Sequence, residues 1–278
     1  MVSLATFVNF GLFSGAKQTS LIFTGDVMLG RSVMSKSLKV KNPNYPFMNV
    51  ADVLRVADIV FSNLESPIVD SCPYVDSGFK FCASPKMIEG LKYAGVDIVN
   101  LANNHILNYG KEGFDQTKKY LDLNGIKWVG DGNLVTLEKN NTKFGFLGFN
   151  FLDNKLQQKD LDLVRSSKGK VDILIVGVHW GEEYTSKANQ NQKLVAGKLS
   201  EAGADYIVGH HPHWVQEIEK EGNTEVYYSL GNFIFDQMWS EETKKGLSVN
   251  LIFKGKKLEK ENLLKLYMEK FAQPKWVN

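Results

Sequence analysis

Short, nearly continuous apolar runs recur along the chain, and they constrain its fold more than any other feature. Eight of them begin at residues 21, 58, 96, 143, 171, 205, 225 and 247, from LIFTG to LSVNLIF. Apolar runs of this length that do not alternate with polar residues are typical of strands covered on both faces. The pattern therefore predicts β-sheets that are buried between other layers.

Amphipathic segments that end in glycine separate several of these runs, at residues 85–95, 112–125 and 190–203. In the first segment Met87, Leu91 and Ala94 fall on one face, and a terminal glycine is a common helix C-cap. Each segment is followed closely by another apolar run. Strand, helix, strand is therefore the repeating unit, and sheets built from it are expected to be mostly parallel.

Composition narrows the class of protein. The 278 residues include 33 Lys and Arg against 31 Asp and Glu, and 43% are hydrophobic. This nearly neutral balance argues against a nucleic-acid partner, which requires a basic excess or stripe. The hydrophobic content suffices for a core and excludes a disordered chain. No apolar stretch is long enough for a spanning helix inside the body of the chain.

The N-terminal segment, residues 1–19, has two interpretations. Its first sixteen residues are apolar and aromatic, and Ser14 and Ala16 stand where a signal peptidase prefers small side chains. No Lys or Arg precedes the apolar run, so a short N-terminal arm fits as well as a secretory signal or clipped anchor. No Pro- or Ser-rich linker follows, which predicts a single domain over residues 20–278.

Cys72 and Cys82 are the only cysteines, too few for a disulfide scaffold or a four-thiolate zinc site. A bridge between them would stabilise the fold by roughly 2–3 kcal/mol in the chain-entropy model, and it would require an oxidising compartment. Two reduced thiols are the alternative. Residues 254–278 alternate charged and apolar side chains, which indicates a closing strand or helix at the surface.

Residues that can bind metal follow five of the apolar runs. They are Asp26, Glu65, Asn103, Asn104, His105, His179, His210, His211 and His213, and they include all five histidines. Ligands bind beyond the carboxyl ends of the strands in open α/β sheets, so these side chains are expected to share one site. Imidazole with carboxylate favours Zn, Mn or Fe over Mg or Ca.

Such a site can hold two metal ions roughly 3.5–4 Å apart on a bridging carboxylate. The pair lowers the pKa of a bound water toward about 7 and clamps the oxygens of a tetrahedral phosphorus. This chemistry needs no Ser or Cys nucleophile, and the sequence contains no G-x-S-x-G motif. A metal-dependent hydrolase with one or two divalent ions is therefore predicted.

The ordered motifs resemble the CapA-type family of poly-γ-glutamate capsule-synthesis proteins (PGA_cap), an outlying branch of the calcineurin-like metallophosphoesterases. The matching stretches are GDVMLGR, ADIVFSNLESPI, AGVDIVNLANNHILNYG, VGVHWGEEY, GADYIVGHHPHWVQ and YYSLGNFIFDQ. The resemblance implies an α/β fold, a four-layer αββα sandwich of two mixed sheets with helices outside. It implies a phosphoesterase-like hydrolase in capsule synthesis, in or near a bacterial cell envelope or outside the cell, although a cytoplasmic location also fits the sequence. The substrate would be small or polymeric and anionic, and membrane-bound capsule-synthesis proteins would be partners.

The resemblance also implies roles for individual residues. Glu65 would bridge two metals; Asp26 and His213 would complete one site, and Asn104, His179 and His211 the other. His105 would contact the scissile phosphate or protonate the leaving group. Arg31 would orient an anionic substrate, and His210 a neighbouring ligand.

Two positions depart from the family pattern. The first motif usually reads Asp-x-His, whereas Val27 and Met28 follow Asp26 here, which leaves one metal with fewer ligands. Related sequences usually carry an acid where this chain has Asn108. An asparagine accepts a hydrogen bond from His105 but stabilises an imidazolium less, so turnover is expected to be modest.

Structural roles are the alternative for several of these residues. Asp26 would then cap a helix, Glu65 would be an exposed turn carboxylate, and Gly231 with Asn232 is expected to form a turn. Glu182 and Glu183 are expected to be solvated or to lie behind the ligands, and Trp180 and Trp214 to wall the cleft. Two other functions remain open: a polymer assembly, anchoring or export factor that uses the metal for amide or transfer chemistry, and a non-catalytic metal-binding module.

Overall fold

The computed structural model describes residues 17–152 and 154–278. The signal, anchor or arm interpretations of residues 1–16 therefore lie outside the described residues. The first sheet contains β1 (Gln18–Val27), β2 (Ile59–Leu64), β3 (Ile98–Asn100), β4 (Lys127–Val129), β11 (Asn232–Ile234), β12 (Lys245–Lys254), β13 (Lys257–Lys270) and β14 (Gln273–Val277). Its strand order is β14-β13-β12-β1-β2-β3-β4, and β11 pairs with β1.

The second sheet has six strands in the order β5-β6-β7-β8-β10-β9. They are β5 (Val135–Lys139), β6 (Thr142–Asn150), β7 (Ile173–His179), β8 (Tyr206–His210), β9 (Ile218–Glu221) and β10 (Thr224–Tyr227). Each of the eight predicted apolar runs overlaps a strand of one of the two sheets. The C-terminal region forms strands β13 and β14, so its strand alternative is confirmed.

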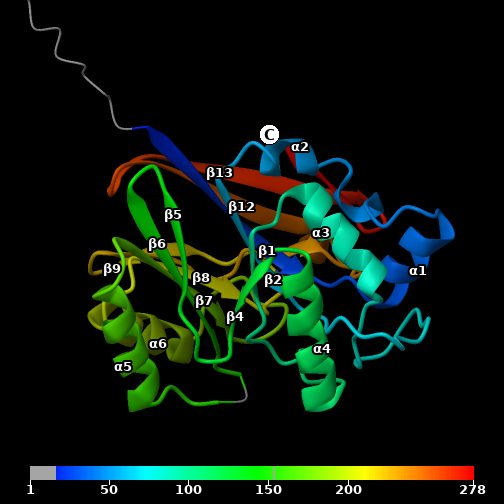
Figure 1. Cartoon of the computed structure of the whole chain (residues 1–278), viewed down its shortest axis with the longest axis horizontal. Helices are drawn as coiled ribbons and strands as arrows, with labels where there is room; N and C mark the ends of the chain where they lie inside the picture. Colours follow the sequence, from blue (N-terminus) through cyan, green and yellow to red (C-terminus); the bar gives the residue numbers. More distant parts are fainter. Residues whose placement is uncertain (1–16, 153) are drawn as a thin grey trace, which may run out of the picture.

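Helices cover the outer face of each sheet (Figure 1). The helices are α1 (Arg31–Lys39), α2 (Ala51–Leu54), α3 (Ile88–Ala94), α4 (Gly110–Leu123), α5 (Gln158–Lys168), α6 (Gln190–Glu201) and α7 (Glu241–Lys244), with 3-10 turns at Tyr45–Phe47 and Pro85–Met87. The three predicted helices correspond to α3, α4 and α6. Gly95, which follows α3, has φ +75°, a left-handed conformation that glycine adopts without strain.

Three hydrophobic clusters fill the spaces between the four layers. Because side chains alternate along a strand, Leu21 and Phe23 of β1 face the second sheet, whereas Ile22 faces the helices beside the first. On the second sheet Ile175 points to the inner cluster and Val176 to α5 and α6. This two-sided burial explains the continuous apolar runs, and it confirms the four-layer α/β sandwich.

The sheets are mixed, and most of the pairings between their strands are parallel, as the repeating unit predicts. Strands β1 to β4 run parallel, as do β6, β7, β8 and β10. The expectation is wrong for the run at 247, because β12 pairs antiparallel with both β1 and β13. Only a turn separates β12 from β13, and a turn joins antiparallel neighbours. Among the described residues, no helix is both long and apolar enough to cross a membrane.

Candidate metal centre

The predicted ligands gather where the parallel strands of both sheets end. Asp26 lies in β1, Glu65 directly follows β2, and Asn104 follows β3. From the second sheet, His179 is the last residue of β7, and His211 directly follows β8. The two sheets face each other across the inner cluster, so their carboxyl ends contribute to one centre.

Asp26 and Glu65 form the carboxylate part of the centre, and neither side chain is exposed. One ligand atom from each, together with one from His213, lies within 4.8 Å of the others. The Nδ1 atom of His213 is 3.2 Å from Asp26 Oδ2, and its Nε2 atom is 3.7 Å from Glu65 Oε1. Three of the predicted ligands therefore converge on a common point.

Asn63 holds the two carboxylates together. Its Nδ2 atom donates to Asp26 Oδ1 at 2.8 Å and to Glu65 Oε2 at 3.2 Å. Its own Oδ1 atom accepts a hydrogen bond from Asn103 Nδ2 at 3.3 Å. The sequence interpretation missed Asn63, although its position two residues before Glu65 in a strand places both side chains on one face.

The second group of ligands comes from the other sheet. The Nε2 atom of His179 lies 3.0 Å from Asn104 Oδ1, and the ring centroids of His179 and His211 are 4.9 Å apart. His211 and His213 have φ values of +98° and +59°. Residues other than glycine rarely adopt such conformations, and they cluster where function requires a fixed geometry.

Several buried polar atoms of the centre lack a hydrogen-bond partner among the described residues. They include Glu65 Oε1, His179 Nδ1 and His211 Nδ1. An unpaired polar atom in the interior is unfavourable by about 1–3 kcal/mol, and a cation bound between Asp26, Glu65 and His213 would satisfy Glu65 Oε1. The donor set therefore fits a divalent metal of the Mn, Zn or Fe class.

The protonation of the centre follows from its burial. Burial, together with the nearby Asp26 charge, raises the pKa of the Glu65 carboxyl well above its usual value. Burial also acts on Asp26, but hydrogen bonding to His213 and the nearby histidines outweigh it and hold that pKa below its usual value. Burial lowers the pKa of His211 to about 3 and that of His179 well below its usual value. Neutral imidazoles are the form that binds metal.

His105 lies at the edge of this group. Its Nε2 atom is 3.9 Å from Glu65 Oε1, and its Nδ1 atom is 3.1 Å from Asn108 Oδ1. Because the amide oxygen accepts, it assigns the proton of the neutral ring to Nδ1. Burial lowers the pKa of His105 to about 4, so its Nε2 atom presents a lone pair toward the centre.

Arg31 reaches the centre with its guanidinium already engaged. It forms an ion pair with Asp236, and its Nη1 atom donates to Gly78 O at 2.7 Å. Its Nε atom is buried without a partner among the described residues. The predicted role of Arg31 in orienting an anion stays a prediction.

His210 lies apart from the candidate ligand groups. Its Nε2 atom donates to the backbone carbonyl of Thr24 at 3.1 Å, and His210 belongs to neither group of candidate ligands.

Several structural alternatives prove wrong. Glu65 is buried rather than exposed, and Asp26 lies inside β1 rather than at a helix N-terminus, since α1 begins after Gly30 without a side-chain cap. Asn232 begins β11, and its Oδ1 atom contacts His213 Nδ1 at 2.9 Å. Asn232 is therefore part of a strand paired with β1 rather than of the predicted turn, and it contacts the predicted ligand His213.

The tryptophans and glutamates around the centre also differ from expectation. Trp180 does not wall the cleft, because it is fully buried under α6 and donates from Nε1 to Tyr228 O at 2.9 Å. Trp214 is half-buried near Tyr184, with ring centroids 6.5 Å apart. Glu183 is exposed as expected, but a carboxylate oxygen of it lies within 4.8 Å of ligand atoms of His211 and His213. The sequence position of Glu183, four residues after His179, did not predict this proximity, because the conformation of the intervening turn decides the direction of the Glu183 side chain.

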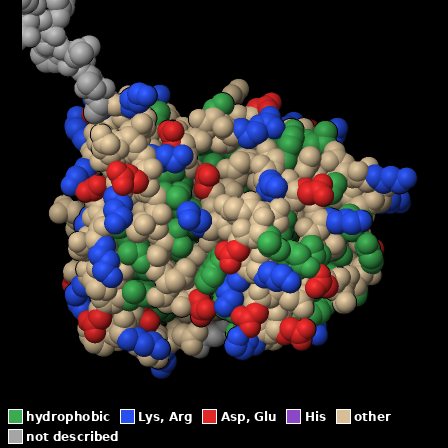
Figure 2. All heavy atoms as spheres, in the orientation of Figure 1, with side chains coloured by type: hydrophobic (Ala, Val, Ile, Leu, Met, Phe, Trp, Pro, Cys, Tyr) green, Lys and Arg blue, Asp and Glu red, His purple; other side chains and the backbone are tan. Residues whose placement is uncertain are grey.

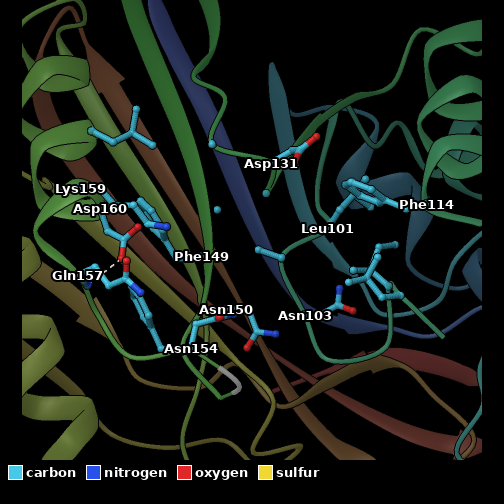
Figure 3. Close-up of a pocket in the computed structure, with 18 of the residues that line it drawn as sticks. Leu101, Asn103, Phe114, Asp131, Phe149, Asn150, Asn154, Gln157, Lys159 and Asp160 are labelled. Atoms are coloured by element: carbon cyan, nitrogen blue, oxygen red, sulfur yellow. Dashed lines mark hydrogen bonds between the residues drawn. The ribbon is translucent and has the colours of Figure 1, made fainter. Parts of the chain in front are cut away.

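A cavity of about 510 Å³ is lined by Asn103, the residue before the predicted ligand Asn104. Figure 3 shows Asn103 and Phe114 on one side of it and Phe149, Gln157 and Asp160 on the other. Asn103 precedes the ligand Asn104 in the chain, and Asn150 is paired in register with His179. The cavity therefore lies next to predicted ligands in the chain, but its walls come from the outer helices α4 and α5 and the loops near them, and none of the six predicted ligands lines it. Elsewhere on the face drawn in Figure 2, basic and acidic side chains are interspersed.

Comparison with known proteins places the chain among bacterial capsule proteins. The family model described as "Bacterial capsule synthesis protein PGA_cap" matches residues 20–237. The chain is 32% identical over 253 residues to the capsule biosynthesis protein CapA of Bacillus anthracis, covering 81% of this chain and 61% of that protein. It is 33% identical over 245 residues to the PGA biosynthesis protein CapA of Bacillus subtilis strain 168, covering 80% and 64%. The chain spans less than two thirds of the length of these relatives.

Solved structures share the fold at low sequence identity. A crystal structure described as a novel phosphatase from Mycoplasma pneumoniae matches with a TM-score of 0.60 and 17% identity, covering 91% of this chain and 94% of that chain. A hypothetical protein from Thermus thermophilus matches with a TM-score of 0.59 and 16% identity, covering 89% and 98%. These similarities show that the chain shares its fold with these two proteins.

Proposed function

The chain belongs to the PGA_cap family of bacterial capsule synthesis proteins, and from this premise we propose that it is a divalent-metal-dependent phosphoesterase of the cell envelope. Its substrate would be an anionic phosphate ester, small or polymeric. The Cys72–Cys82 disulfide supports an oxidising compartment. The observation that carries the proposal is the convergence of the buried residues Asp26, Glu65 and His213, whose ligand atoms lie within 4.8 Å of one another while Glu65 Oε1 has no hydrogen-bond partner among the described residues.

The metal would be held by Asp26, Glu65 and His213 and by Asn104, His179 and His211. When bound, a divalent ion supplies Lewis acidity and lowers the pKa of water. The low pKa values of His179 and His211 keep both rings neutral for binding at neutral pH. Asn63 and Asn232 hold Asp26, Glu65 and His213 in place through hydrogen bonds.

His105 and Arg31 would act on the substrate. The negative charge of a phosphate raises the pKa of a neighbouring imidazole, so His105 Nε2 would take up a proton with substrate and pass it to the leaving oxygen. The ion pair with Asp236 partly neutralises the charge of Arg31. Arg31 would therefore contribute more to the orientation of the phosphate than to the strength of its binding. The cavity beside Asn103 is suited to the organic part of the ester.

Purified protein loaded with manganese or zinc tests this proposal. We expect bound metal by elemental analysis and hydrolysis of phosphate mono- or diesters. Substitutions His179→Ala and His211→Ala should each lower both, because each removes a buried nitrogen of the centre. Equal activity of these variants and the parent protein would overturn the proposal.

A second candidate is a capsule assembly, anchoring or export factor that uses the metal for amide or transfer chemistry. The names of the two Bacillus relatives favour it, since both are described by capsule or PGA biosynthesis. A deletion strain that keeps its surface polymer unchanged would contradict this candidate.

A further inference from the structure

The loop between Cys72 and Cys82 lies against both predicted substrate-contacting residues. A disulfide between Cys72 and Cys82 closes this loop, so the bridged alternative is the one that the structure contains. Most side chains from residue 73 to residue 80 are exposed, and Phe79 is 84% exposed. A segment with so few buried groups has little stability of its own. Its last two residues, Phe81 and Cys82, are by contrast buried.

Phe81 contacts His105 in two ways. Its ring stacks on the imidazole with centroids 3.8 Å apart and an interplanar angle of 20°. Its backbone N–H donates to Asn108 Oδ1 at 2.6 Å, and the same oxygen is 3.1 Å from His105 Nδ1. Phe81 therefore fixes the plane of the His105 ring directly and fixes its hydrogen-bond partner as well.

The same loop also holds Arg31. The guanidinium carbon of Arg31 lies 4.2 Å from the Phe81 ring centroid, and Nη1 donates to Gly78 O. A Cβ atom added at Gly30 would lie 2.2 Å from Cys82 O, so the loop end sits directly on the backbone that precedes Arg31. His105, Phe81 and Arg31 thus form a three-layer stack anchored next to the disulfide.

We propose that residues 72–82 are a positioning element: the disulfide holds Phe81, and Phe81 sets the orientation of the His105 ring. None of the predicted metal ligands lies in this loop, so its role is separate from metal binding. The effect on catalysis rests on the proposed function, whereas the orientation of His105 does not. Proton transfer requires a donor within hydrogen-bond reach of the leaving oxygen, and a tilted His105 ring loses that reach.

Nuclear magnetic resonance of the zinc-loaded protein tests the orientation directly. The stacked Phe81 ring should shift the C2 proton of His105 upfield, and His105→Gln identifies that signal. The double variant C72S/C82S, which keeps the Phe81 ring, should move it downfield, whereas Phe81→Tyr and the exposed control Phe79→Leu should leave it in place. A His105 signal that is the same in all these proteins would overturn the proposal.

Hydrolysis tests the consequence with two leaving groups. An alkyl phosphate needs a proton on its leaving oxygen, whereas 4-nitrophenyl phosphate does not. Phe81→Leu and C72S/C82S should lower kcat for the alkyl ester about tenfold or more, with little change for the nitrophenyl ester, in KM or in zinc content. Phe81→Tyr should restore the activity. An equal loss for both esters would refute a positioning role, and inactivity of every protein, the parent included, would refute the proposed function while the resonance experiment still decides the orientation.

Discussion

Glu65 is buried where an ionised carboxylate is least stable without a cation. Its Oε1 atom has no hydrogen-bond partner among the described residues, and burial raises its pKa well above the usual value. The charge that would bind metal therefore destabilises the metal-free fold. The contributions of Glu65 to metal affinity and to the stability of the metal-free protein can be measured separately, because glutamine is a neutral side chain of the same shape.

The substitution Glu65→Gln should separate the two effects. Without metal, we expect the free energy of unfolding to stay the same or rise by about 1 kcal/mol, because an unpaired buried charge is removed. Affinity for manganese or zinc should fall at least tenfold, since a shared ligand is lost. Urea unfolding in chelator and calorimetric titration measure these quantities.

Glu182→Gln is the matched control, because Glu182 is exposed and belongs to neither candidate ligand group. It should change neither stability nor metal affinity. Metal binding by Glu65→Gln at the parental affinity would contradict the assignment of Glu65 to the centre.

Single residues show how far the sequence could predict the site. The six proposed ligands belong to a larger set of residues that follow apolar runs, where ligands bind, and the family resemblance distinguished them within that set. Asn232 was assigned to a turn, because Gly-Asn is a common turn pair and its pairing with β1 is not visible locally. Phe81 gave no signal either, since its importance comes from contact with a residue from another segment.

The packing of neighbouring strands depends on close backbone contacts that only small residues permit. Where β1 meets the segment before β11, a Cβ atom at Gly25 would lie 2.0 Å from Gly231 O. The adjacent Asp26 N–H donates to that same oxygen at 2.9 Å. The position of the ligand Asp26 therefore depends on a glycine next to it.

Gly25→Ala should lower the free energy of unfolding by about 2 kcal/mol or more, because two backbones must separate. Gly197→Ala in α6 is the contrasting variant, since the nearest atom to its added Cβ would be Glu221 Oε1 at 3.8 Å. Helix propensity predicts stabilisation by about 0.5–1 kcal/mol there. Urea unfolding checks both, and a Gly25→Ala protein as stable as the parent would contradict the contact.

Elements with a strong local pattern were predictable, and elements without one were not. The apolar runs and glycine-terminated helices carry strong local patterns, but β4 and β11 have only three residues each. Helix α1 begins without a capping side chain, so no start signal precedes it. The direction of β12 depends on what lies beside it in the sheet, which its own apolar run does not encode.

The molecule as a whole should lose stability in mild acid. Burial lowers the pKa of His105 to about 4 and of His211 to about 3, and it lowers those of His179 and His210 as well. In the unfolded chain each histidine takes up a proton near about pH 6.5. Glu65 has the opposite effect, because its raised pKa lets the folded state keep a proton that the unfolded state releases. Burial also raises the pKa values of Glu225 and Asp97, which are less buried than Glu65. The four histidines outnumber these three acids, so the unfolded state binds more protons between about pH 4.5 and 6.5.

The free energy of unfolding of the metal-free protein should therefore fall as the pH decreases through this window. Each uncompensated histidine contributes up to about 1.4 kcal/mol per pH unit. Urea unfolding in chelator at several pH values gives the slope, and His105→Gln should reduce it by about one proton. A free energy that is constant or rises toward acid would contradict the buried, neutral state of these rings.

The pairing of β1 also bears on how the chain is made. Phe23 of β1 is paired with Val249 of β12, so β1 meets this neighbour only after the whole segment between the two strands has been synthesised. Contacts between such distant segments slow folding, and an unpaired strand edge attracts other chains. The nascent protein therefore carries an unpaired strand edge until β12 has been made, and its soluble yield in an expression host should depend on chaperone supply and on growth temperature.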